Sequence, residues 1–166
     1  MIRKTVQQSL SSEQKIPRRF TGYCFLKYRL LALDFTLTLE MRYKNLLLID
    51  DDEDDQELFI EAAKEISADI HITVVPDASI ALEKLIQKAV TADIIFSDLN
   101  MPRMNGQQFL LEIKRRPELK DIPVIIFSTS SHSHTIQLVK EFGAHEFITK
   151  PGLFKELVST LERILA

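Results

Sequence analysis

The chain has 166 residues, the length of one ordinary globular domain, and 45% of them are hydrophobic, enough to form a buried core. Its formal net charge of -3 is unevenly spread: residues 1–40 carry seven Lys and Arg against three acids, whereas residues 41–166 carry fourteen against twenty-one. An acidic domain disfavours binding to a nucleic-acid backbone, and no apolar run reaches the roughly 18 residues that span a bilayer. We therefore expect neither a nucleic-acid nor a membrane partner. The single Cys24 excludes an internal disulfide, which suits the reducing cytoplasm, and we expect a cytoplasmic protein.

Residues 1–40 form a basic leader without clean periodicity. A domain beginning at Met41 would already contain its complete first strand. Two interpretations therefore stay open. Residues 1–40 are an N-terminal extension of unknown role, either ordered or disordered, or the start codon was assigned upstream of the true one, at Met41. Residues 41–166 are expected to form the folded domain.

From residue 45 onward, short apolar runs alternate with segments of helical periodicity. The apolar runs predict five strands, at 45–50, 70–75, 93–98, 123–128 and 145–149. Helices are predicted after the strands from apolar stripes: Phe59, Ala62, Ala63 and Ile66 in the first, Leu82, Leu85, Ile86 and Ala89 in the second, Phe109, Leu110 and Ile113 in the third, and Phe154, Leu157, Val158 and Leu161 in the last. The fourth helix is expected over roughly 132–142, with Gly143 at its C-terminal end.

Five such strand–helix units predict an α/β fold with a parallel sheet and helices on both faces. The runs LLLI at 46–49 and VIIF at 124–127 are apolar without alternation. Strands buried on both faces require this pattern.

Polar side chains follow the predicted strands where each one ends. The first strand ends at Asp50 and Asp51, the third at Asp98, the fourth at Ser128 and the fifth at Lys150. In an open parallel sheet, ligands bind outside the carboxyl ends of the strands, so we expect these side chains to converge on one edge.

The charges of this group predict a divalent cation. Asp50, Asp51 and Asp98 are three carboxylates, Lys150 supplies one positive charge, and a divalent ion would neutralise the rest. All the candidate ligands are oxygens, which favours Mg²⁺ over zinc. An Asp beside a Lys and a hydroxyl is then a candidate carboxylate nucleophile for phosphoryl transfer.

The motifs IDD at 49–51, DLNMPRMNG at 98–106, PVIIFST at 123–129 and FITKP at 147–151 occur in this order. In this respect the chain resembles the receiver domain of bacterial two-component response regulators, over essentially all of residues 44–166. The resemblance implies a (βα)5 flavodoxin-like, doubly wound parallel sheet with strand order 2-1-3-4-5. It also implies a single-domain response regulator, because the stand-alone chemotaxis regulator is similar in size.

The resemblance further implies roles for individual residues. Asp98 would be the phosphoacceptor, and Lys150 would pair with the phosphoryl oxygens. Asp51 and Asp98 would bind Mg²⁺ directly, with the backbone carbonyl of Asn100, and Asp50 would reach it through water. Such a protein catalyses only its own phosphorylation and dephosphorylation, and is not otherwise an enzyme.

The expected signal passes through Ser128 and Phe147. Ser128 would hydrogen-bond the phosphoryl group, and Phe147 matches the aromatic switch position, so that the output surface is the fourth helix, fifth strand and fifth helix. The implied partners are a sensor histidine kinase or a histidine phosphotransfer protein and an unknown downstream protein, with the chain itself a monomer or weak homodimer. Phe147 departs from the Tyr of some members, Gly152 stands where many carry Phe, and the resemblance implies a cis Lys150–Pro151 bond.

Two other classes of function are compatible with parts of the pattern. One is a Mg²⁺-dependent phosphohydrolase or phosphotransferase with an aspartyl-phosphate, which is weakened because residue 100 is Asn rather than a second acid. The other is a receiver-like scaffold that works without phosphorylation, which would not need the acids, Ser128 and Lys150.

The acid run at 50–55 divides into two parts on this interpretation. Asp50 and Asp51 belong to the site, whereas Asp52 to Asp55 begin a helix and interact favourably with its dipole. In three consecutive aspartates, a shift of one residue would assign the metal to Asp52, so this register stays open.

Overall fold

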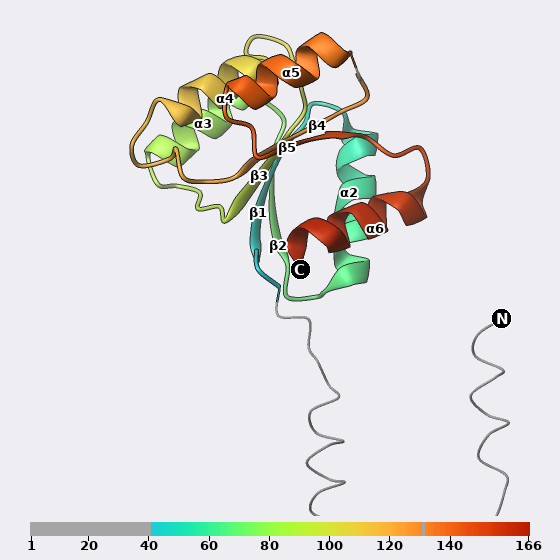
Figure 1. Ribbon diagram of the computed structural model, residues 1–166. Helices are drawn as coiled ribbons and strands as arrows, with labels where there is room; N and C mark the ends of the chain where they lie inside the picture. The colour runs from blue at the N-terminus through green and yellow to red at the C-terminus, as the bar shows by residue number, and fades with distance from the viewer. Residues whose placement is uncertain (1–40, 131) are drawn as a thin grey trace, which may run out of the picture. The chain divides into compact units, whose positions relative to one another are not determined.

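The computed structural model describes residues 41–130 and 132–166, and the expectations for residues 1–40 lie outside this range (Figure 1). Strands and helices alternate along the described chain. They are β1 (Asn45–Ile49), α2 (Glu53–Ile66), β2 (His71–Val75), α3 (Ala78–Ile86), β3 (Ile94–Ser97), α4 (Gly106–Lys114), β4 (Val124–Ser128), α5 (Ser133–Glu141), β5 (Glu146–Thr149) and α6 (Phe154–Leu165).

The five strands form one parallel sheet in the order β2-β1-β3-β4-β5, as predicted. Helices α2 and α6 cover one face, and α3, α4 and α5 cover the other (Figure 1). The order reverses after β2, so β1 and β3 become neighbours although a helix, a strand and another helix separate them in sequence. This reversal places the ends of β1 and β3 side by side.

Successive side chains of β1 divide between two cores. Leu47 and Ile49 pack with residues of α3, α4 and α5, whereas Leu46 and Leu48 pack with residues of α2 and α6. All four are at most 1% exposed, because neighbouring residues of a strand point to opposite faces and both faces are covered. The unbroken apolar run therefore has the burial that its pattern predicts.

The elements begin and end close to where the sequence places them. Gly143 follows α5 with a φ of +93°, a conformation that favours glycine, and so confirms its predicted position. One expectation is wrong: no peptide bond within residues 41–130 or 132–166 is cis, so the Lys150–Pro151 bond is trans. Within the same residues, no helix is both long and apolar enough to cross a bilayer.

Candidate functional site

Three carboxylates meet at the carboxyl edge of the sheet. Asp50, Asp51 and Asp98 each offer an oxygen atom, and these atoms lie within 4.8 Å of one another. Backbone hydrogen bonds continue one residue past the strands, from Asp98 N–H to the carbonyl of Ile49 at 2.8 Å. This hydrogen bond therefore holds the Asp98 backbone against the end of β1. Asp50 and Asp98 are buried, whereas Asp51 is exposed.

Lys150 supplies the positive charge beside these acids. Its Nζ donates to Oδ2 of Asp50 and to Oδ2 of Asp55, both at 2.6 Å, and lies 3.9 Å from Oδ1 of Asp98. The side chain is only 9% exposed, and Nζ lies 5.9 Å from the centre of the Phe127 ring. The backbone N–H of Lys150 donates to the carbonyl of Ser128 at 2.9 Å. This bond ties the start of the Lys150 loop to the end of β4.

Asp55 is the residue of this cluster that sequence reasoning missed. The acid run predicts only a helix-dipole role for it, but its carboxylate forms an ion pair with Lys150. Asp55 lies in the first turn of α2, which begins at Glu53 after the N-cap Asp52, and this turn brings its carboxylate to Lys150. Asp51 precedes the helix, so no helical spacing within the acid run singles out Asp55.

The remaining acids of the run begin the helix. Asp52 is the N-cap of α2, and its Oδ1 accepts from the backbone N–H groups of Asp54 and Asp55 at 2.9 and 3.2 Å. Asp50 in turn accepts from the N–H of Asp52 at 3.1 Å. The carboxylate of Asp52 is therefore committed to the helix, which favours Asp51 over Asp52 for the metal.

Burial and pairing shift the pKa values of the two central groups. Burial raises the pKa of Asp50, and the hydrogen bonds from Lys150 and from the Asp52 N–H only partly offset it. Burial lowers the pKa of Lys150, but the hydrogen bonds to Asp50 and Asp55 outweigh it, so the pKa is raised overall. Lys150 is thus held charged, while the negative charge of Asp50 is costly. A further cation at the cluster would stabilise it.

The loop after β3 holds the Asp98 carboxylate from its other side. The backbone N–H of Asn100 donates to Oδ2 of Asp98 at 3.1 Å. The first residue of α4, Gly106, packs so closely that a Cβ there would overlap the carbonyl oxygen of Asp98. The N–H of Gly106 donates to the carbonyl of Leu99 at 3.0 Å. The start of α4 therefore sets the position of the Asp98 backbone.

Ser128 and Phe147 lie on neighbouring strands. Ser128 is fully buried at the end of β4, and its Oγ accepts from the N–H of Ser130 at 3.4 Å. Phe147 lies on β5 opposite Ile126 of β4 and is partly buried against the core that α3, α4 and α5 cover. Ser128 therefore lies on the strand next to β3, and Phe147 lies on the edge strand beside it, the strand that leads to Lys150.

The donor set fits a hard divalent cation. The three clustered residues offer only carboxylate oxygens, which Mg²⁺ and Mn²⁺ accept readily. Two of the three are buried, and their negative charges exceed the single charge of Lys150. A divalent cation would therefore compensate the excess negative charge of the cluster.

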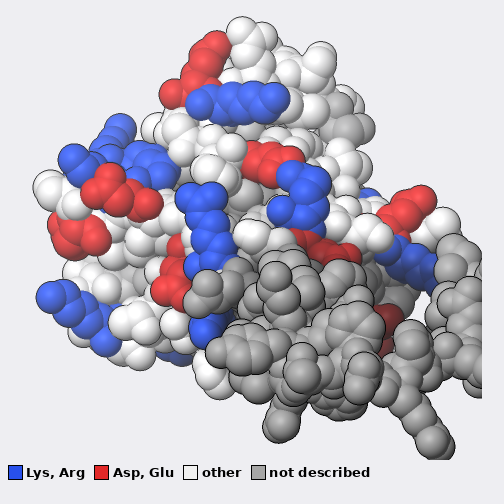
Figure 2. Space-filling view, turned by 60° about the horizontal axis from the view of Figure 1, so that its bottom comes forward, with Lys and Arg blue, Asp and Glu red and all other residues white. Residues whose placement is uncertain are grey.

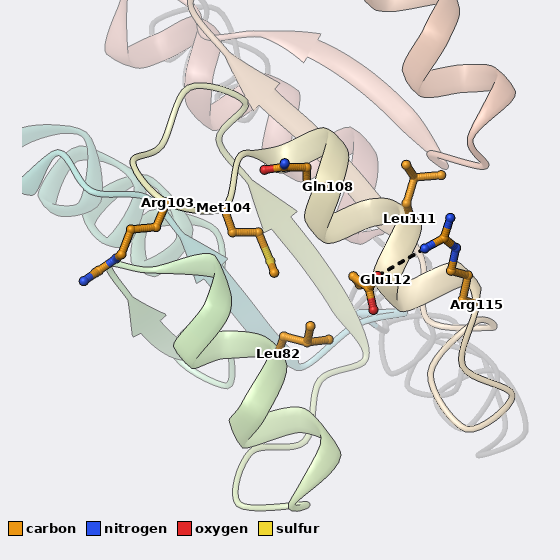
Figure 3. Close-up of a pocket in the computed structure, with 7 residues that line it drawn as sticks. All are labelled: Leu82, Arg103, Met104, Gln108, Leu111, Glu112 and Arg115. Atoms are coloured by element: carbon orange, nitrogen blue, oxygen red, sulfur yellow. Dashed lines mark hydrogen bonds and ion pairs between the residues drawn. The ribbon is translucent and has the colours of Figure 1, made fainter.

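A hollow lies away from this edge, between α3 and α4 (Figure 3). It measures about 340 Å³ and is lined by Leu82, Arg103, Met104, Gln108, Leu111, Glu112 and Arg115. Elsewhere on the described surface, Figure 2 shows basic and acidic side chains interspersed on the face turned toward the viewer. The carboxylate edge brings three acids within 4.8 Å of one another beside Lys150 and is therefore the candidate site.

The sequence and the fold of the chain are similar to those of known proteins. The sequence model of the family described as response regulator receiver domain matches residues 46–162. The chain belongs to the response regulator receiver family. Among curated relatives, the response regulator Rcp1 of Synechocystis sp. is 29% identical over 126 residues, which are 73% of this chain and 86% of Rcp1. The two-component response regulator ORR6 of rice, Oryza sativa subsp. japonica, is 32% identical over 64% of this chain and 62% of ORR6.

Solved structures agree on the fold. The phosphorylated cyanobacterial phytochrome response regulator RcpA is 31% identical with a TM-score of 0.68, over 74% of this chain and 91% of RcpA. The Mn²⁺-bound form of Rcp1 is 29% identical with a TM-score of 0.66, over 73% of this chain and 91% of Rcp1. The chemotaxis regulator CheY4 of Vibrio cholerae is 26% identical with a TM-score of 0.63, over 74% of this chain and 98% of CheY4. The predicted family and strand order are therefore confirmed: this is a response regulator receiver domain of the two-component type.

Proposed function

We propose that the receiver domain accepts a phosphoryl group on Asp98 from a phosphohistidine of a sensor histidine kinase or a histidine phosphotransfer protein. The observation that carries the proposal is the convergence of Asp98 with two further carboxylates and the Lys150 ammonium at one edge of the sheet. RcpA, a relative of similar fold, has been solved in a phosphorylated form. Positioning and electrostatics are the main means by which proteins promote phosphoryl transfer.

The chain's own groups have separate tasks in this reaction. Asp50, Asp51 and Asp98 would hold Mg²⁺, with the backbone carbonyl of Asn100, and Asp50 would do so through water. The ion supplies positive charge for the transferred phosphoryl oxygens. The Rcp1 structure with Mn²⁺ supports a divalent ion in this family. Lys150 brings its ammonium to within 3.9 Å of the Asp98 carboxylate and would pair with the phosphoryl oxygens.

The signal would then move to the surface of α5, β5 and α6. The Ser128 hydroxyl would hydrogen-bond the phosphoryl group, and Phe147 would rotate inward after it. Two contacts support this route: the carbonyl of Ser128 accepts from the Lys150 N–H, and the strand of Phe147 pairs with the strand of Ser128. Phosphorylation adds charge and acceptor oxygens at a site that these residues border.

The setting of the domain follows from this role. We place it in the cytoplasm as a monomer or weak homodimer that contacts its phosphodonor and a downstream protein, with residues 41–166 as the receiver domain and residues 1–40 as an extension or a mis-assigned start. Its chemistry would be confined to its own phosphorylation and dephosphorylation.

Mass spectrometry with a small phosphodonor tests the proposal. Wild type incubated with Mg²⁺ and acetyl phosphate should gain the mass of one phosphoryl group, and Asp98→Asn should not. Asp121→Asn is the matched control, because it removes an exposed carboxylate elsewhere and should leave the gain intact. An unmodified wild type under these conditions contradicts the proposal, and rapid multiple turnover of organic phosphates would point to a phosphohydrolase instead.

A further inference from the structure

Asp55 is a charged group at the site that does not belong to the carboxylate trio of Asp50, Asp51 and Asp98. It belongs to the first turn of α2, and its Oδ2 lies 2.6 Å from Nζ of Lys150. Its side chain is 35% exposed, whereas that of Asp50, the other partner of Lys150, is 3% exposed. Asp55 is therefore the solvent-facing member of the pair of acids that holds Lys150.

The geometry at Nζ shows what this contact does. A lysine ammonium has three N–H donors, and two of them are directed at Asp50 and Asp55. The distance from Nζ to Oδ1 of Asp98 is 3.9 Å, which is too long for a hydrogen bond. Lys150 is thus held beside the phosphoacceptor without bonding to it.

We infer that Asp55 is a positioning residue that competes with the phosphoryl group for Lys150. The inference rests on the proposed phosphorylation of Asp98. The Asp55 carboxylate draws the ammonium toward α2, and its own negative charge opposes the arrival of phosphoryl oxygens. The same charge attracts a cation to the trio. Asp55 therefore favours the metal-bound, unphosphorylated form of the domain.

If Asp55 has this role, removing its charge should change the affinities for a phosphoryl mimic and for Mg²⁺ in opposite directions. Asp55→Asn replaces the carboxylate with a neutral amide oxygen that attracts the Lys150 ammonium less strongly, and so should strengthen the binding of an anionic phosphoryl mimic. Removing a negative charge near the trio should at the same time weaken the binding of Mg²⁺. A residue that merely supported the fold of the site would weaken both when changed.

Asp54→Asn is a matched control for Asp55→Asn. Asp54 occupies the same first turn of α2, is exposed, and loses the same charge at the same helix end. Within the described residues, the side-chain carboxylates that pair with Lys150 Nζ come from Asp50, Asp55 and Asp98 rather than from Asp54. Asp55→Glu is the conservative variant, because it keeps the charge at the contact.

Calorimetric titration of the full chain measures both affinities. Mg²⁺ is titrated alone, and beryllofluoride is then titrated at Mg²⁺ concentrations well above each variant's own Kd. For Asp55→Asn we expect beryllofluoride to bind about two- to fivefold more tightly and Mg²⁺ about two- to fivefold more weakly, the size typical of a partly exposed charge pair. Asp54→Asn should stay close to wild type, and Asp55→Glu should return toward it.

The possible failures are distinguishable. If Asp55→Asn binds both ligands more weakly, or binds both as wild type and Asp54→Asn do, the inference is overturned while the proposed function stands. If wild type itself does not bind beryllofluoride in the presence of Mg²⁺, the proposed function fails and this inference fails with it.

Discussion

Lys150 is the cation on which the buried acids of the site depend. The side chains of Asp50 and Asp98 are 3% and 10% exposed, so water screens their charges poorly. The ammonium approaches both acids and also lies over the ring of Phe127. Breaking a buried ion pair by removing one partner leaves an uncompensated charge, which is more costly than the pair itself was favourable.

Lys150→Met should therefore destabilise the domain. We expect the free energy of unfolding to fall by roughly 1–3 kcal/mol in the absence of divalent cations, because the Asp50 carboxylate loses its partner. Urea unfolding followed by circular dichroism measures this change. Lys155→Met, on the exposed surface of α6, is the control and should cost little. Equal stability of Lys150→Met and wild type would show that the pair contributes nothing to folding.

Asp77 is another buried carboxylate with a defined partner. It caps α3, accepting from the N–H groups of Ser79 and Ile80 at 2.8 and 3.1 Å, and pairs with Arg103 of the β3–α4 loop. The Ser79 hydroxyl, the backbone N–H groups and Arg103 lower the pKa of Asp77 from 3.8 to about 2, against the opposing effect of burial. Folding therefore favours the charged form of Asp77.

This lowered pKa predicts an acid-dependent difference between wild type and Asp77→Asn. A carboxyl whose pKa falls on folding contributes its stability above its unfolded pKa of 3.8 and loses it as the pH drops toward about 2. Because solvent reaches the pair at Arg103, we expect an advantage of about 1–2 kcal/mol at neutral pH. Urea unfolding from pH 7 to pH 2 measures it, with the exposed Asp69→Asn as control. A difference that does not shrink in acid contradicts the assignment.

Among the helices, α4 packs closely against the site through its first residue, Gly106. Gly106 approaches the Asp98 backbone so closely that a methyl group would overlap the Asp98 carbonyl oxygen and lie 3.0 Å from Cα of Leu99. Asn105, the N-cap of α4, forms a capping box with Gln108. The helix is therefore fixed at its first residue by sterics and by its cap.

Gly106→Ala should displace this helix start. We expect a loss of roughly 1–3 kcal/mol in the free energy of unfolding, because backbone atoms must move to accept the methyl group. We also expect acetyl phosphate to modify Asp98 more slowly, because the added methyl group would displace the backbone carbonyl oxygen of Asp98. Gly152→Ala is the control: a Cβ there has nothing within 4 Å and should be tolerated. Equal stability of the two variants would show that α4 adjusts freely.

Periodicity and strand-end chemistry predict most of these elements but not all of their contacts. Leu46 to Ile49 could be assigned to a doubly buried strand because the run is apolar without alternation, and Gly143 because helices commonly end at glycine. The Arg103–Asp77 pair joins residues 26 apart in sequence, and Arg103 has a φ of +67°, so no local pattern predicts it. The contact of Asp55 with Lys150 could not be predicted, because the acids of the run 50–55 cannot be told apart before the first residue of the helix is known.

At the scale of the whole molecule, the strand order assembles the site. Because β1 and β3 are neighbours at the centre of the sheet, Asp50 and Asp98 lie together, and β4 and β5 bring Ser128 and Lys150 to the same edge. These residues span a hundred positions of the chain, since Asp50 and Lys150 bond across that separation. The family and fold were predictable from the motifs. The roles of the individual site residues stay predictions: Asp50, Asp51, Asp98, Asn100, Ser128, Phe147 and Lys150.

The pairing of β1 with β3 also links metal binding to folding of the whole domain. A ligand that binds only the folded state adds about 2.7 kcal/mol to the free energy of unfolding at a hundred times its Kd. We expect Mg²⁺ to stabilise wild type in this way, because the trio joins the ends of β1 and β3 only in the folded sheet. Urea unfolding with and without Mg²⁺, at constant ionic strength, measures the increment.

Two neighbouring variants separate metal binding from helix capping in this experiment. Asp51→Asn should lose most of the Mg²⁺ increment with little change in baseline stability, because Asp51 is exposed and belongs to the trio. Asp52→Asn removes a charge one residue away, at the N-cap of α2, and should keep most of the increment. Asn is itself a good N-cap, so its baseline should also stay near wild type. Equal loss of the increment in both variants would mean that Asp52 shares the metal, and that the acid run divides one residue later than the geometry indicates.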